Sequence, residues 1–195
     1  MFKTRFQTIQ DAQKIDGWMK PIELEGLYEL AQKYIGRYGR ALEVGSWKGR
    51  SSLVLAEVCR QKGAMLTCLD TFTGSELNEA HYQEALNLGA DKFMETYIKN
   101  SLHNYPVNYI VGNSTEKHRE LHDNLYDLVF IDGNHCYPVI GYDLDNFYPK
   151  LKSKGVFICH DYADVCPDVK QAVNDKFGLN RIEYFYESLI GIIKE

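Results

Sequence analysis

Apolar residues recur at helical spacing near the amino terminus of the chain. Leu24, Leu27 and Ala31 follow one another at three- and four-residue steps, and Pro21 stands where the segment begins. This spacing places the apolar side chains on one face of a helix, and Pro is favoured in the first turn because the amide it lacks would have no helical partner. The pattern therefore predicts a one-sided helix that ends at Gly36.

Short apolar runs alternate with segments of helical periodicity in the rest of the chain. Strands that are separated by helices are joined by right-handed crossovers, so the alternation predicts a mostly parallel sheet with helices on both faces. The last two apolar runs are too close for a crossover and predict an antiparallel hairpin at one edge. The predicted strands are 40–45, 65–70, 107–111, 127–132, 155–159, 181–186 and 189–193, and the predicted helices are about 51–59, 91–102, 115–122, 139–151 and 169–177.

The predicted fold class is α/β, with a Rossmann-like, doubly wound, mostly parallel seven-stranded sheet and a C-terminal antiparallel hairpin. A length of 195 residues suits one domain, 1–195, made of an N-terminal helical segment, 1–39, and a core, 40–195. One stretch does not fit the alternation. Residues 71–89 form a long connection, which we expect to be a loop that covers a substrate.

Composition narrows the class of protein. Hydrophobic residues make up 45% and charged residues 25%, as in ordinary globular domains, and the formal net charge of -5 argues against a nucleic-acid partner. No apolar run approaches the roughly 20 residues that span a bilayer, and the first residues lack the apolar core of a signal peptide. We therefore expect a cytoplasmic protein without a membrane partner. The five cysteines lack CxxC spacing and are expected to be free thiols.

A glycine-containing turn links the first predicted strand of the sheet to the next helix. In the segment 43–51, EVGSWKGRS, Gly45 permits a tight turn and Gly49 permits close approach of a backbone. The free amides at the start of the helix offer a site for an anionic group such as a carboxylate. Glycine turns of this kind also occur for purely structural reasons.

Asp70 ends the second strand of the sheet, about 20 residues further on. A carboxylate at this place accepts hydrogen bonds from both hydroxyls of a ribose, so the turn and Asp70 together indicate a cofactor that contains a nucleoside. A nicotinamide cofactor favours the pattern GxGxxG, in which Trp47 replaces the middle glycine here. An NAD(P)-dependent oxidoreductase thus remains an alternative.

Acidic and imidazole side chains follow two neighbouring strands of the predicted sheet. Asp132 ends one strand, and His160 and Asp161 follow the next, so all three are expected in one cleft. One imidazole and two carboxylates suit a divalent cation, Mg²⁺ or Mn²⁺, although acidic residues at strand ends also cap helices and form turns.

The segment 43–51 resembles the first motif of class I S-adenosylmethionine-dependent methyltransferases, particularly the catechol-type O-methyltransferases. The resemblance includes Asp70, the segment VGNS at 111–114 and the segment DGNH at 132–135, and it covers most of residues 40–162. The pattern of Asp132, His135, His160 and Asp161 is most similar to a bacterial group that includes macrolide-sugar O-methyltransferases and proteins named cephalosporin hydroxylases.

The resemblance implies that S-adenosylmethionine is the cofactor of the 40–195 core. Its methionine end would lie against Gly45, Trp47 and Ser51, its ribose against Asp70 and its adenine edge against Asn113 and Ser114. Trp47 could instead be a packing residue. Asn113 and Ser114 could instead cap the helix that follows them. The complete set of expected cofactor-binding residues is Glu43, Gly45, Ser46, Trp47, Gly49, Ser51, Asp70, Asn113, Ser114 and Asp132.

His135 lies three residues beyond Asp132, where catechol-type enzymes carry a catalytic lysine. We expect His135 to act as general base and Asp132 to assist catalysis, with Asp132, His160 and Asp161 as metal ligands. Catechol-type enzymes have Asp and Asn at the last two positions, so His160 is a departure. A loop histidine that only forms hydrogen bonds is the alternative for His135.

The expected activity is that of an S-adenosylmethionine-dependent methyltransferase, with metal-assisted O-methylation of a small hydroxylated molecule. The acceptor would be a sugar, a phenol or another natural-product hydroxyl, and the resemblance suggests a homodimer. Two alternatives remain open at this point: the NAD(P)-dependent oxidoreductase and a catalytically silent module that only binds the cofactor.

Overall fold

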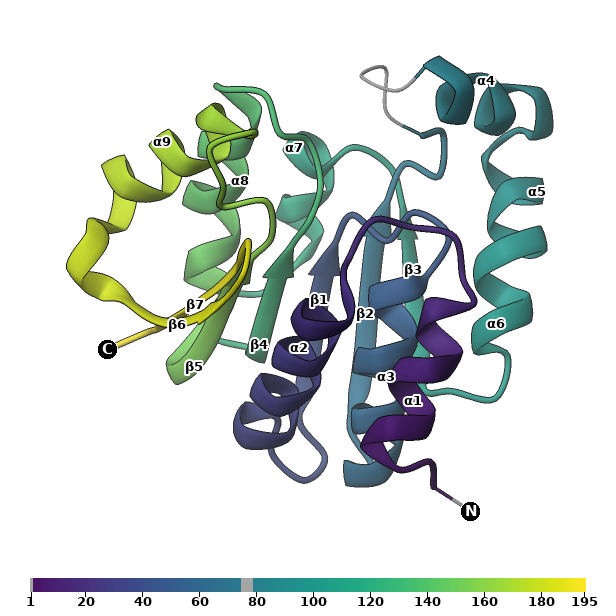
Figure 1. Cartoon of the computed structure of the whole chain (residues 1–195), viewed down its shortest axis with the longest axis horizontal. Helices are drawn as coiled ribbons and strands as arrows, with labels where there is room; N and C mark the ends of the chain where they lie inside the picture. Colours follow the sequence, from purple (N-terminus) through teal and green to yellow (C-terminus); the bar gives the residue numbers. More distant parts are fainter. Residues whose placement is uncertain (1, 75–78) are drawn as a thin grey trace.

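The computed structural model describes residues 2–74 and 79–195, in which seven strands form one sheet (Figure 1). The strand order is β3-β2-β1-β4-β5-β7-β6. The first five strands in this order run parallel, whereas β7 runs antiparallel to both β5 and β6. The predicted fold class, including the hairpin at the edge, is confirmed. The strands are β1 (Arg40–Val44), β2 (Met65–Asp70), β3 (Val107–Val111), β4 (Tyr126–Ile131), β5 (Leu151–Cys159), β6 (Ile182–Tyr186) and β7 (Leu189–Ile193).

Helices precede the sheet and connect its strands. The segment predicted as one helix at 91–102 consists of α5, a π-helical stretch at Met94–Lys99 and α6. The helices are α1 (Arg5–Gln13), α2 (Pro21–Tyr34), α3 (Arg50–Lys62), α4 (Glu79–Leu88), α5 (Ala90–Phe93), α6 (Asn100–Leu102), α7 (Ser114–Lys117), α8 (Val139–Phe147) and α9 (Pro167–Phe177). Each of the described helices falls short of the length and apolar character that a membrane span requires.

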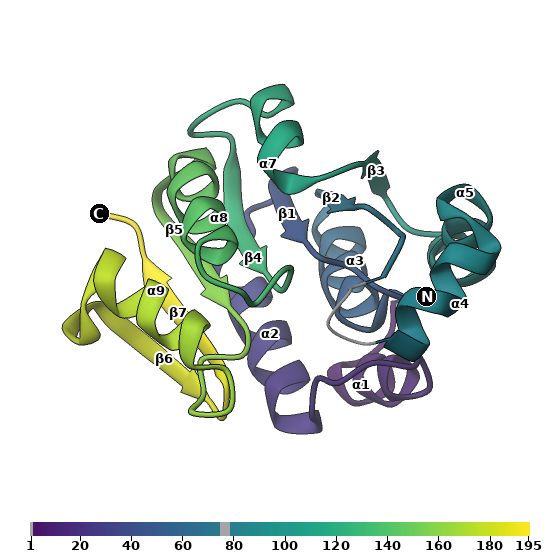
Figure 2. The same cartoon turned by 90° about the horizontal axis from the view of Figure 1, so that it is seen from above.

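Helices cover both faces of the sheet, with α2 and α3 on one side and α7 and α8 on the other (Figure 2). Side chains of a strand point alternately to opposite faces. In β1, Ala41 packs with the apolar residues of α1, α2 and α3, whereas Leu42 packs with those of α8 and α9. Two apolar layers therefore hold the sheet rigidly and fix where its strands end.

The connection after β2 differs from the prediction of a loop over 71–89. Helix α4 occupies Glu79–Leu88 and lies at the end of the sheet to which the strand arrows point (Figure 1). Ala85 is fully buried and Leu88 packs against the same apolar layer, so tertiary burial stabilises a helix in a segment that we expected to be irregular. Residues 75–78, part of the expected loop, lie outside the described residues.

Candidate active site

The turn after β1 lies against the end of β4. Gly45 has a φ of 88°, and a Cβ at this position would lie 2.1 Å from the main-chain oxygen of Asp132. Both the positive φ and this close approach require glycine. The contact joins two segments that the sequence suggested for different tasks, the turn for the cofactor and Asp132 for the metal.

Glu43 lies beneath the turn and is completely buried. Its Oε2 accepts a hydrogen bond from Ser46 Oγ at 2.7 Å and others from Ser52 and Cys68. Its Oε1 has no hydrogen-bond partner among the residues that the structure describes. Burial raises the pKa of Glu43, and the surrounding hydroxyls oppose that shift. The carboxyl group thus stabilises the turn through Oε2, and Oε1 can accept a hydrogen bond from a further donor.

Asp70 accepts hydrogen bonds from three backbone amides. Its Oδ2 receives those of Ser46 at 2.6 Å and Trp47 at 2.9 Å, and its Oδ1 receives that of Phe72 at 2.7 Å. The side chain therefore ties the end of β2 to the turn after β1. Its expected role toward a ribose remains a prediction.

The Trp47 side chain packs among aromatic residues. Its ring centroid lies 5.0 Å from that of Phe93 and 5.9 Å from that of Trp18. The next residue, Lys48, is almost completely buried, and its Nζ lies 3.0 Å from Asp16 Oδ2 and 2.9 Å from Glu84 Oε2. Trp47 therefore has the packing role that the sequence left open as an alternative. Lys48 links the turn to α4 through Glu84.

The remaining residues of the expected cofactor set lie at two helix starts. Gly49 has a φ of 95° and precedes α3, and Ser51 is buried in the first turn of that helix. The Asn113 side chain accepts the amide hydrogen of Thr115 at 3.0 Å, so Asn113 caps α7, in which Ser114 is the first residue. The capping alternative for Asn113 is thus seen directly.

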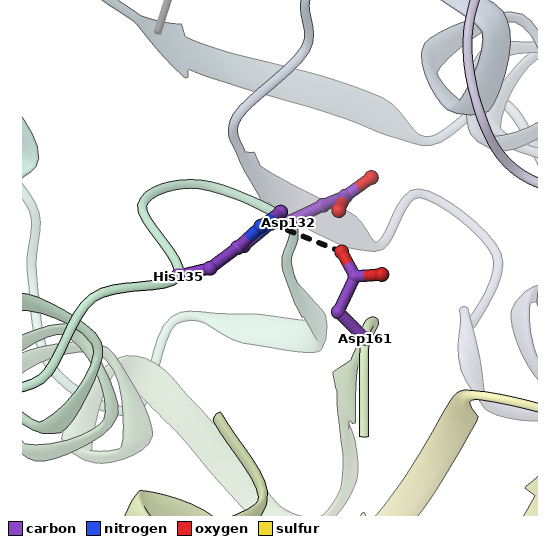
Figure 3. Close-up of side chains that lie close together, drawn as sticks. All are labelled: Asp132, His135 and Asp161. Atoms are coloured by element: carbon purple, nitrogen blue, oxygen red, sulfur yellow. Dashed lines mark ion pairs between the residues drawn. The ribbon is translucent and has the colours of Figure 1, made fainter. Parts of the chain in front are cut away.

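Three side chains beyond the ends of β4 and β5 converge. Possible ligand atoms of Asp132, His135 and Asp161 all lie within 4.8 Å of one another (Figure 3). His135 Nε2 lies 3.0 Å from Asp161 Oδ2, and this hydrogen bond is the main cause of a raised pKa of His135. The cluster therefore combines two carboxylates, which favour cations, with an imidazole whose pKa Asp161 raises.

His160 lies deeper than this cluster and is surrounded by carboxylates. Its Nδ1 is 3.1 Å from Asp132 Oδ1 and 3.0 Å from Asp161 Oδ2, and its Nε2 is 3.2 Å from Glu23 Oε2. Burial alone lowers the pKa of His160, but the three carboxylates outweigh it and raise that pKa well above its ordinary value. The imidazole expected as a metal ligand is here the hydrogen-bond partner of both carboxylates.

Glu23 belongs to the site although the sequence analysis did not single it out. Burial raises its pKa, but hydrogen bonds from His160, Ser188 and the amide of Lys20 together lower it to about 2. One signal was present in the sequence. Glu23 precedes Leu27 by four residues in α2 and therefore lies on the apolar face that packs against the sheet. A charge on such a face indicates a buried partner.

A family model described as a methyltransferase domain matches residues 42–162, which include the turn, Asp70 and the acidic cluster. The chain belongs to this methyltransferase family. It is accordingly a class I S-adenosylmethionine-dependent methyltransferase, as the resemblance in its motifs predicted, and the oxidoreductase alternative is set aside.

Solved structures of other methyltransferases share the fold. A candidate caffeoyl-CoA O-methyltransferase from Staphylococcus aureus has a TM-score of 0.63 at 18% identity, over 99% of this chain and 93% of its own. CalS11, a TDP-rhamnose 3'-O-methyltransferase of calicheamicin biosynthesis, has a TM-score of 0.58 at 16% identity, and the match covers 97% of this chain and 81% of CalS11. MycE, a mycinamycin-pathway methyltransferase in complex with Mg and SAH, has a TM-score of 0.60 at 14% identity, and the match covers 100% of this chain and 55% of MycE. At these identities the likeness concerns the fold.

Proposed function

We propose that this methyltransferase methylates a hydroxyl oxygen of a small molecule with the help of a divalent cation, Mg²⁺ or Mn²⁺. The observation that carries the proposal is the convergence of Asp132, His135 and Asp161 beside the glycine turn. The turn and the cluster touch through Gly45 and Asp132, so a methyl donor held by one lies next to an acceptor held by the other.

The residues around the turn fit S-adenosylmethionine. When bound, the cofactor supplies a methyl group on a positively charged sulfur, which is a good leaving group. The amides in the first turn of α3 suit its carboxylate, and Glu43 Oε1 is a buried acceptor whose partner is absent from the described residues. Asp70 would hold the ribose, at the junction that it already forms between the turn and β2.

The acidic cluster fits a divalent cation. Three carboxylates, those of Glu23, Asp132 and Asp161, surround two imidazoles, so their negative charge exceeds what two protonated rings can neutralise. Asp132 and Asp161 would hold the cation, and His160, whose Nδ1 faces both carboxylates, would complete the ligand set in its neutral form. A bound cation would supply positive charge that lowers the pKa of the acceptor hydroxyl.

His135 would act as the general base. Asp161 holds Nε2 of the ring through the 3.0 Å contact, which leaves Nδ1 as the atom that we assign to take the hydroxyl proton. The acceptor oxygen then bonds to the methyl carbon while the carbon–sulfur bond breaks, and the electron pair of that bond stays on sulfur. Asp161 both orients the imidazole and stabilises its protonated form.

The acceptor class is proposed to be a hydroxylated sugar or phenol. CalS11 acts on a TDP-linked rhamnose, and MycE serves a natural-product pathway, which supports a sugar as the first candidate. We further propose that residues 1–195 work as one domain, because Glu23 in the N-terminal segment, 1–39, reaches the site built on the core, 40–195.

Transfer of a labelled methyl group from S-adenosylmethionine to a panel of hydroxylated sugars and phenols tests the proposal. The product must carry the label on oxygen, and Asp161→Asn should abolish most of the transfer. Asp164→Asn is a matched control, because Asp164 is exposed and pairs only with Lys170 in the described structure. Equal turnover of wild type and Asp161→Asn on the same acceptor would reject the assigned site.

A further inference from the structure

Asp143 is a buried carboxylate to which the proposed reaction assigns no task. It lies in α8, and only 1% of its surface is exposed. Neither of its carboxyl oxygens has a hydrogen-bond partner among the residues that the structure describes. Ile140 and Phe147 lie three residues before and four residues after it, so Asp143 interrupts the apolar face of its helix.

The Asp143 carboxyl group lies close to three segments at one edge of the sheet. Its Oδ2 is 3.7 Å from the position that a Cβ of Gly133 would take, and the main-chain oxygen of Val44 is 3.8 Å from that same position. Ser114, at the start of α7, carries the hydroxyl that lowers the pKa of Asp143. The group thus lies between the end of β1, the loop after β4 and the start of α7.

This environment is costly for a charged group. Burial raises the pKa of Asp143 to about 6, and the Ser114 hydroxyl opposes that rise only in part. Helix α7 is fixed beside it, because the Tyr142 hydroxyl donates a hydrogen bond to the main-chain oxygen of Thr115 at 3.1 Å. A buried carboxylate with the Ser114 hydroxyl beside it can accept further hydrogen bonds, and a ligand is one source of the donor.

We propose that Asp143 recognises the nucleobase of the cofactor by accepting a hydrogen bond from the exocyclic amino group of adenine. The inference rests on the proposed placement of S-adenosylmethionine. Ser114 belongs to the proposed cofactor-binding set and lies beside Asp143, so a base held at the start of α7 would lie next to this carboxylate. An ionised carboxylate only accepts hydrogen bonds, so it selects an amino group over an oxo group.

Titration calorimetry with S-adenosylhomocysteine and S-inosylhomocysteine tests the proposal. The two ligands differ at position 6 of the base, which carries an amino group in adenine and an oxo group in hypoxanthine, and at N1, which accepts a hydrogen bond in adenine and donates one in hypoxanthine. Wild type should bind the adenine compound at least about tenfold more tightly, and Asp143→Asn, whose amide can donate to an oxo group, should lose most of this preference. Asp145→Asn, in the exposed part of the same helix, should keep it.

The outcomes separate the two proposals. If wild type binds S-adenosylhomocysteine and Asp143→Asn keeps both the affinity and the preference, the role of Asp143 is wrong while the cofactor site stands. If wild type binds neither compound, the proposed cofactor site fails as well. Thermal unfolding verifies that each variant is folded, and Asp143→Ser provides a second removal of the carboxylate if Asp143→Asn does not fold.

Discussion

Neutralising Asp143 should stabilise the unliganded protein at neutral pH. The pKa of this carboxyl group is about 6 in the folded chain, above its ordinary value of 3.8, because burial disfavours the charge. The folded state therefore binds more protons than the unfolded state between about pH 4 and pH 6, and the stability of the wild type falls as the pH rises through this window. Asn has nearly the shape of the protonated acid and avoids the penalty.

The size of the effect follows from the two pKa values. They differ by about 2, and each pKa unit corresponds to about 1.4 kcal/mol, so ionisation of Asp143 costs about 3 kcal/mol in the folded state. Asp143→Asn should be more stable than wild type by up to about 3 kcal/mol above pH 7. The difference should shrink between pH 6 and pH 4 and vanish below about pH 4.

Urea denaturation followed by circular dichroism at several pH values measures this difference directly. Asp145→Asn is the matched control, because the Asp145 side chain is 71% exposed on the same helix and its pairing with Lys176 contributes little. A gap between Asp143→Asn and wild type that is the same at pH 4 and pH 8 would refute the reasoning, and so would a variant that is less stable at pH 8.

Three further substitutions test the turn after β1, the proposed ribose site and the proposed general base. Gly45→Ala should destabilise the fold by about 3 kcal/mol or more, because its Cβ would lie 2.1 Å from the Asp132 main-chain oxygen at a positive φ; chemical denaturation measures this, and a loss below about 1 kcal/mol would contradict it. Asp70→Ala should weaken S-adenosylhomocysteine binding at least about tenfold in calorimetry, and unchanged affinity in a folded variant would remove the ribose assignment. His135→Gln should lower turnover by roughly 10² to 10⁴ while cofactor binding persists, and near-normal turnover would leave His135 as a positioning residue. Because the Asp161 contact raises the pKa of His135, the wild-type rate should rise with pH through an ionisation above the ordinary 6.5.

Much of the fold was predictable because its signals are local. The strands β2, β3 and β7 have the predicted bounds, since each is a short apolar run between residues that end strands. Helix α4 was missed because the segment lies in a connection and owes its helical structure to tertiary burial of residues such as Ala85. Similarly, the π-helical stretch at Met94–Lys99 has no local pattern that distinguishes it from an α-helix.

The site was predictable where it follows strand ends and not where it depends on packing. Asp132 and Asp161 converge because parallel strands end at the same edge of a sheet. Glu23 and Asp143 were missed although each interrupts the apolar face of its helix, because the sequence does not show which groups pack against that face. His160 shows the same limit, since the sequence placed it in the cleft but not between three carboxylates.

Removal and restoration of the divalent cation tests the central claim most directly. The protein is stripped with excess chelator until elemental analysis detects no metal, and methyl transfer to the oxygen of a turned-over acceptor is measured before and after addition of Mg²⁺ or Mn²⁺. The account predicts loss of transfer on stripping, recovery on addition, and no recovery in Asp161→Asn. Full turnover by the stripped protein would contradict it.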